Sequence, residues 1–68
     1  MSIEIFVNGH THATAAGQTV LGLLDELGLD PARVAVELDR SIVKQARWAD
    51  TALHSGAQLE IVQFVGGG

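Results

Sequence analysis

Three consecutive glycines, Gly66, Gly67 and Gly68, follow an apolar segment at the end of the sequence. Glycine has no Cβ atom, so such a stretch can enter a channel that is too narrow for other residues. Three extended residues reach at most about 10 Å, and the one reactive group that they would deliver is the carboxylate of Gly68. A carboxylate is a poor electrophile until one oxygen is turned into a good leaving group, as in an acyl-adenylate. The tail suits a protein that is a substrate of other enzymes, although functionless flexible ends are also common.

The three histidines offer the other candidate chemistry. His10 and His12 form an H-x-H pair on one face of an expected strand, which is compatible with half of a metal site that His54 could join. The chain has no cysteine, so the remaining ligands would have to be carboxylates, and isolated surface histidines are the commoner case. No Ser/His/Asp arrangement and no phosphate-binding glycine loop follows from the spacing. We therefore expect neither a catalytic residue nor a bound metal.

Size and charge limit the classes of partner. The 68 residues allow one small domain, and the net charge of −4 repels phosphate backbones, so nucleic acid is not an expected partner. No apolar run approaches the roughly 20 residues that cross a bilayer. The first residues do not resemble a signal peptide, and we expect a cytoplasmic protein with no membrane partner. Three of the four basic residues lie close together, which is consistent with a docking patch or with a solvated loop: Arg40, Lys44 and Arg47.

Alternating apolar residues predict a mixed sheet with one helix across it. Asn8-Gly9 predicts a hairpin, formed by a two-residue type I′ turn or with a bulge at Gly9. Thr19 is the expected N-cap of a helix of about eight residues, and Gly28 the expected residue after its C-terminus. The expected strands cover about residues 3–7, 10–15, 34–38, 41–43 and 58–65, with a helical turn between 48 and 53.

The last strand predicts an exposed apolar patch. Leu59, Ile61 and Val65 would share the face that packs on the helix, which places Val62 and Phe64 on the open face. Together with Phe6 from the first strand, these two residues would form a partner-binding surface at the root of the glycine tail. The alternative is that Phe64 folds under the loop that carries Trp48. Trp48 itself is expected to anchor that loop by packing with Leu53.

The sequence resembles the ThiS family, sulfur carriers of thiamine biosynthesis in the ubiquitin-like β-grasp group. The resemblance covers nearly the whole chain and depends on the order of several short segments. These are the Asn8-Gly9 hairpin, the entry Ala16-Gly17-Gln18-Thr19-Val20 to a leucine helix, Val34-Ala35-Val36-Glu37-Leu38, Ile42-Val43, Arg47-Trp48, and the closing run from Glu60 to Gly68. It implies an α+β, β-grasp domain at 1–65, with a mixed sheet of four to five strands and one main helix across one face, and a flexible glycine tail at 66–68.

The resemblance also implies how the tail is used. Gly68 matches the residue whose carboxylate a ThiF-like enzyme adenylates with ATP, and Gly66 and Gly67 belong to the tail that presents it. A cysteine desulfurase-type donor would supply the sulfur of a C-terminal thiocarboxylate, which the thiazole synthase ThiG would consume. The chain would bind no cofactor of its own and would catalyse nothing. Three alternatives remain: the small subunit of molybdopterin synthase, a ubiquitin-like binding module with an inert tail, and a metal-binding protein that uses His10 and His12.

Overall fold

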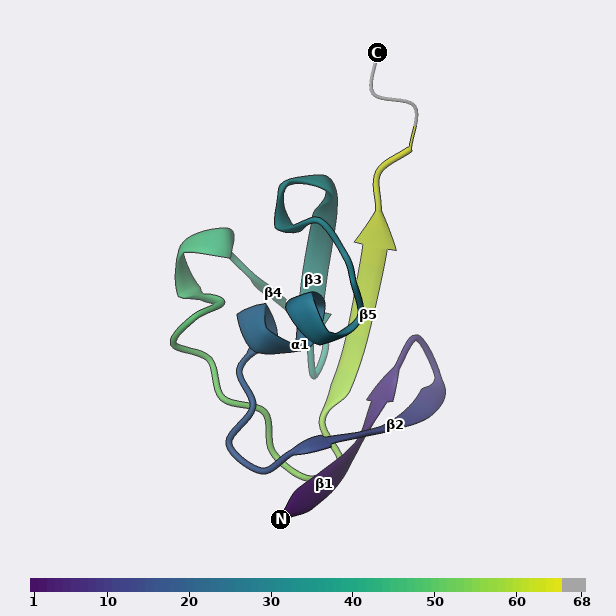
Figure 1. The fold of residues 1–68 in the computed structure, drawn as a ribbon. Coiled ribbons are helices and arrows are strands. Elements are labelled where there is room, and N and C mark those ends of the chain that lie inside the picture. The colour runs from purple at the N-terminus through teal and green to yellow at the C-terminus, as the bar shows by residue number, and fades with distance from the viewer. Residues whose placement is uncertain (66–68) are drawn as a thin grey trace.

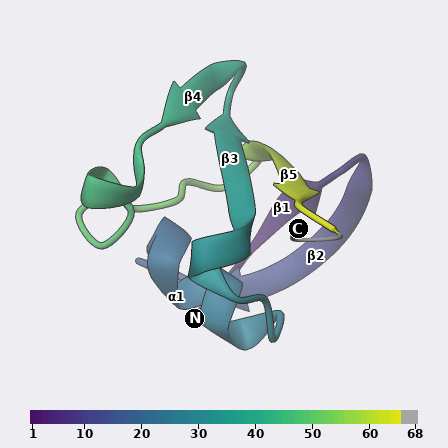
Figure 2. The same cartoon turned by 90° about the horizontal axis from the view of Figure 1, so that it is seen from above.

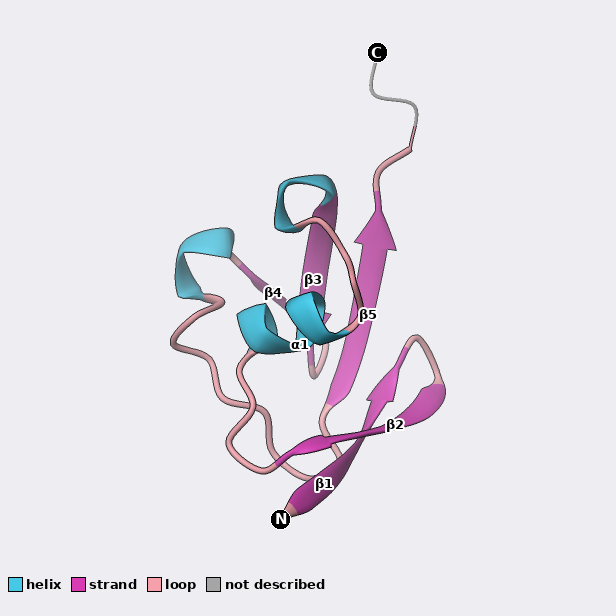
Figure 3. Cartoon of the chain, in the orientation of Figure 1, coloured by secondary structure: helices cyan, strands magenta, loops and turns pink. Residues whose placement is uncertain are grey.

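The computed structural model describes residues 1–65 of the chain. It contains one five-stranded sheet in the order β2-β1-β5-β3-β4, with α1 packed across one face (Figures 1 and 2). β1 and β5 are parallel, and every other neighbouring pair is antiparallel. The expected mixed sheet with one main helix is confirmed. The elements are β1 (Ser2–Val7), β2 (His10–Ala15), α1 (Val20–Glu26), the 3₁₀ turn η1 (Pro31–Arg33), β3 (Val34–Leu38), β4 (Ser41–Val43), the 3₁₀ turn η2 (Gln45–Arg47) and β5 (Gln58–Gln63), coloured by type in Figure 3.

The β1–β2 hairpin has a two-residue turn. Asn8 and Gly9 have φ angles of 51° and 83°, which is the left-handed pair that a type I′ turn requires. Val7 lies opposite His10, and Ile5 lies opposite His12. The register therefore settles the two alternatives in favour of the simple turn without a bulge, and it places both imidazoles on the face that carries Ile5.

The helix begins and ends at the expected residues. The Thr19 hydroxyl accepts a hydrogen bond from the Gly22 amide at 3.0 Å, as an N-cap does. At the other end Gly28, with φ of 73°, directs the Leu29 amide back to the carbonyl of Leu24 at 2.9 Å. This is a Schellman motif, and only a residue that tolerates a positive φ forms it cheaply. The helix has seven residues, one fewer than expected.

The core lies between α1 and the sheet. Trp48 is only 3% exposed, and its indole N–H donates to the carbonyl of Val43 at 2.8 Å. The expected anchoring of the loop by Trp48 is confirmed, but the helical turn η2 lies before it instead of after it. Val65, expected inside, is 88% exposed because β5 ends at Gln63. The buried apolar residues are Ile5, Val20, Leu23, Leu24, Val34, Val36, Trp48, Leu53, Ala57, Leu59 and Ile61.

Glu26 connects the end of α1 to β2. Its carboxylate accepts a hydrogen bond from the buried Thr14 hydroxyl at 2.7 Å and from the Gln18 amide at 3.2 Å. The ring of His12 lies 3.2 Å from the same carboxylate. These contacts, the Thr14 hydrogen bond first, lower the pKa of Glu26. Glu26 and His12 therefore serve the fold at this place.

Asn8 also holds the far half of β5. β1 pairs with β5 only at Gln58 and Leu59. Beyond that point the Asn8 side chain takes over: its Oδ1 accepts from the Ile61 amide at 2.7 Å and its Nδ2 donates to the Ile61 carbonyl at 3.1 Å. One side chain thus imitates the next step of the parallel ladder and fixes β5 close to its C-terminal end.

A second side-chain clamp joins the β3–β4 turn to the start of β5. Asp39 Oδ1 accepts from the Gln58 amide at 3.0 Å, and Asp39 Oδ2 lies 2.7 Å from Nε2 of His54. The other ring nitrogen of His54 lies 2.9 Å from the carbonyl of Ser55. The hydrogen bond to Asp39, and then that to Ser55, raises the pKa of His54, and the same bond to His54 lowers the pKa of Asp39.

Replacing Asn8→Gly separates the turn from the clamp. Glycine keeps the left-handed turn but removes both hydrogen bonds to Ile61, so the free energy of unfolding should fall by about 1–3 kcal/mol. Urea denaturation measures the loss. Asn8→Asp keeps the acceptor and removes the donor. Its free energy of unfolding should therefore lie between that of the wild type and that of the glycine variant. A loss below about 0.5 kcal/mol for the glycine variant would show that water replaces the clamp at no cost.

The Asp39–His54 clamp predicts a pH window. The part of stability from His54 is complete below its ordinary pKa of 6.5 and is lost as pH rises through the raised value. The part from Asp39 is complete above 3.8 and is lost as pH falls through the lowered value. Asp39→Asn keeps the turn and an acceptor for Gln58. The difference in unfolding free energy between wild type and this variant should therefore be largest between roughly pH 4 and 6.5 and smaller at alkaline pH. A difference at alkaline pH as large as that between roughly pH 4 and 6.5 would contradict the clamp. His10→Gln, which removes a histidine outside the clamp, serves as the control.

Candidate functional site

The root of the glycine tail is the end of the central strand. β5 pairs with β3 as far as Gln63, which lies opposite Val34. One more hydrogen bond follows, from the Phe64 amide to the Arg33 carbonyl at 2.7 Å. After it the chain leaves the sheet, and Val65 is largely exposed. Gly66, Gly67 and Gly68 lie outside the described residues, so their roles as tail and loading site stay predictions.

The open face of the sheet carries the expected apolar residues. Val62 and Phe64 are 59% and 56% exposed. Trp48 is buried in the core between the helix and the sheet, so the alternative in which Phe64 folds under the Trp48 loop is wrong. Phe64 instead lines a shallow hollow with Ala32, Arg33 and Val65. The exposure of the two residues is confirmed, and their binding role stays a prediction.

Phe6 lies on the same face but at a distance from Phe64. It is opposite Gln58 in the parallel pair, and it is only partly exposed. Val62 follows Gln58 by four residues, which is roughly 13 Å along a strand. Glu60 lies between them and borders the hollow beside Phe6 as well as the one beside Val62. The predicted three-residue patch is therefore an elongated face with a carboxylate in its middle.

Ile42 is an exposed residue that the sequence interpretation missed. It is 78% exposed and lies opposite Glu37 in the β3–β4 pair. A signal was available, because Val43 faces the core and alternation then turns Ile42 outward. Ile42 extends the apolar surface from β5 to the edge strand β4. A shallow hollow there is lined by Ala35, Val36, Glu37, Ile42, Glu60 and Val62.

The histidines do not form one cluster. His12 is engaged by Glu26, and His54 by Asp39. In the part of the chain that the structure describes, no group of three or more histidine, aspartate or glutamate side chains is arranged to hold a metal ion. The three basic residues Arg40, Lys44 and Arg47 are all exposed, and the docking patch and the solvated loop both stay predictions.

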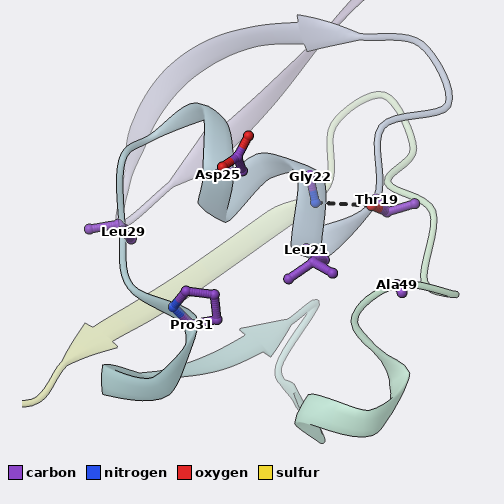
Figure 4. A pocket seen from close by; sticks show the side chains of 7 residues that line it. All are labelled: Thr19, Leu21, Gly22, Asp25, Leu29, Pro31 and Ala49. Atoms are coloured by element: carbon purple, nitrogen blue, oxygen red, sulfur yellow. Dashed lines mark hydrogen bonds between the residues drawn. The ribbon is translucent and has the colours of Figure 1, made fainter.

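A further groove lies on the helix side of the molecule. Leu21, which is 39% exposed, lines this groove together with Leu29, Pro31 and Ala49 (Figure 4). Asp25 is the one ionisable residue in its lining. One carboxylate beside apolar groups provides neither a nucleophile with its base nor a set of metal ligands.

Among residues 1–65, no helix is long and apolar enough to cross a membrane.

Comparison with known proteins places this geometry in a family. The ThiS family model matches residues 5–68. The chain is 33% identical to the sulfur carrier protein ThiS of Escherichia coli K12, over 97% of this chain and all of that protein. It is also 42% and 39% identical to thiazole synthases of Paramagnetospirillum magneticum and Magnetococcus marinus. In both cases it spans only about 20% of the length of the relative.

Solved structures agree with this assignment. The crystal structure of a thiamine biosynthesis protein (ThiS) from Geobacter metallireducens superposes with a TM-score of 0.83 at 28% identity, over 97% of this chain and 100% of that one. The solution structure of a thiamine biosynthesis protein from the same organism gives a TM-score of 0.79 at 30% identity, over 97% and 88% of the two chains. The family model, the relatives and the solved structures agree, and the chain belongs to the ThiS family.

Proposed function

We propose that this protein is a sulfur carrier for the formation of the thiazole of thiamine. The observation that carries the proposal is the family match, which continues through residue 68 and so includes Gly68. The exposed end of the central strand supports it, since Phe64 makes the last described hydrogen bond to the sheet. In this function other enzymes bind the folded domain and perform the chemistry on the Gly68 carboxylate.

The chemistry at Gly68 proceeds in two displacements. In the first, a carboxylate oxygen attacks the α-phosphorus of ATP in a ThiF-like enzyme, and pyrophosphate leaves to give the acyl-adenylate. In the second, a sulfur nucleophile attacks the carbonyl carbon and AMP leaves with the bonding electrons. Where the sulfur arrives as a persulfide from a cysteine desulfurase-type donor, a thiol then cleaves the S–S bond and releases the thiocarboxylate. Gly68 has no side chain, so its carbonyl carbon is open to each attack.

The acceptor that we propose is thiazole synthase, the ThiG type of enzyme. Two relatives that contain a region similar to this chain are named thiazole synthases, which favours this acceptor over molybdopterin synthase. The chain itself would catalyse no step and would hold no cofactor. Its acidic character, with a net charge of −4, is also unfavourable for binding to nucleic acid.

The proposal predicts a change in the mass of the intact chain. Incubation with ATP and a ThiF-like enzyme should add AMP, and a persulfide donor with a thiol should then exchange one oxygen for sulfur. Intact-protein mass spectrometry detects both products. Deletion of Gly68 should abolish them and leave the melting temperature unchanged, because the last described hydrogen bond to the sheet is at Phe64. An unmodified wild-type chain in the presence of an active enzyme would refute the proposal.

The predicted partner surface has its own test. Phe64→Asp places a charge on an apolar side chain that is 56% exposed, so adenylation should lose about 10–100-fold in kcat/KM while the fold persists. Leu21→Asp is the matched control on the helix side, where it changes the groove of Figure 4. Steady-state release of pyrophosphate measures both variants. If the Leu21 variant is the impaired one, the partner approaches the helix side and the assignment of Phe64 is wrong.

A further inference from the structure

Two glutamates face each other in the middle of the open sheet face. Glu37 of β3 lies directly opposite Glu60 of β5 in the antiparallel ladder. Opposed residues bring their Cβ atoms to about 4.5–5.5 Å, and like charges at that separation destabilise a sheet. Within residues 1–65 the ion pairs involve other residues, so nothing described there neutralises either carboxylate. The fold thus keeps an unfavourable pair at an exposed place.

Apolar side chains surround this pair. Ile42 lies opposite Glu37 on the outer side, and Val62 follows Glu60 by two residues on the same face. These two apolar residues are 78% and 59% exposed. They line one hollow with both glutamates, and Glu60 borders a second hollow beside Phe6. An exposed apolar face with charge at its centre has the composition of an interface whose partner supplies the opposite charge.

We propose that this Glu37–Glu60 face docks a protein surface that places an arginine between the two carboxylates and apolar side chains against Ile42 and Val62. A guanidinium can donate to two carboxylates at once, and its planar face packs well on apolar side chains. The proposal rests on the proposed function, because it assigns this surface to the enzyme that adenylates Gly68.

The position of the face relative to the tail supports that partner. Three residues separate Val65 from the Gly68 carboxylate, and they span at most about 10 Å. An enzyme that acts on Gly68 must therefore come close to the end of β5. Val62 lies three residues before Val65 and Glu60 two before that, so the face continues directly from the place that the enzyme has to approach.

Other occupants fit less well. A second copy of this chain, related by a two-fold axis, would bring the same glutamates against each other on a molecule whose net charge is already −4. A metal ion would find only two carboxylates, since no third histidine, aspartate or glutamate of residues 1–65 completes a site. A cationic protein surface is the occupant that removes the repulsion between the glutamates.

The test compares two double variants that each remove two negative charges. Glu37→Gln with Glu60→Gln neutralises the face, and Asp25→Asn with Asp50→Asn removes the same charge from exposed positions on α1 and in the loop after η2. Binding to the ThiF-like enzyme is measured by calorimetry without ATP. The face variant should bind at least about tenfold more weakly, with a smaller salt dependence, while the control changes less than about threefold. The melting temperature of the face variant should be unchanged or higher, because a repulsion is removed.

Equal weakening in both variants would show a general effect of net charge and overturn the proposal. Unchanged binding of the face variant, or no binding of the wild-type chain, would overturn it as well. A marked fall in melting temperature would show that the glutamates stabilise the sheet instead of straining it, and this also counts against the proposal. The proposed function is tested separately: if the wild-type chain binds through this face but is never adenylated, only that function fails.

Discussion

The structure depends on the position of β5 between β1 and β3. This strand pairs in parallel with β1 and antiparallel with β3. Its side chains Leu59 and Ile61 are buried in the core. The contact with β1 is short, covering two residue pairs. Side chains hold β5 at two further positions, Asp39 at Gln58 and Asn8 at Ile61. Both clamps come from turns with positive φ, so hairpin geometry and strand position are coupled.

Much of this fold could be predicted from short-range signals. Asn8-Gly9, the Thr19 cap, Gly28 and the alternation of Val34, Val36 and Leu38 each report a local preference, and the structure has each element where the signal lies. What could not be predicted is the second function of those residues. The bonds from Asn8 to Ile61 span 53 positions, and nothing local to Asn8 indicates them. Glu26 is likewise the acceptor for Thr14 and Gln18, and no local pattern around Glu26 indicates these contacts.

The candidate site was also predictable only where a local pattern determines it. Alternation along the last strand placed Val62 and Phe64 on the open face, because period two needs no knowledge of the partner strands. It could not show that Glu37 lies opposite Glu60, since that depends on the register between β3 and β5. Nor could it locate Phe6 beside Gln58, away from Phe64, because the pairing joins the first strand to the last. Strand ends are similarly set by tertiary pairing, and Val65 consequently lies outside the sheet.

The order of the strands has a consequence for folding during synthesis. During synthesis the β1–β2 hairpin, the helix and the β3–β4 hairpin all emerge before the strand that must slide between them. Until β5 is present, the edges of β1 and β3 that pair with it have no partner strand, and the core lacks Leu59 and Ile61. A nascent or truncated chain that ends before β5 therefore cannot join its two hairpins into one sheet. The open-face surface that includes Glu60 and Val62 exists only once β5 has paired with β3, so it is the last part of the sheet to form.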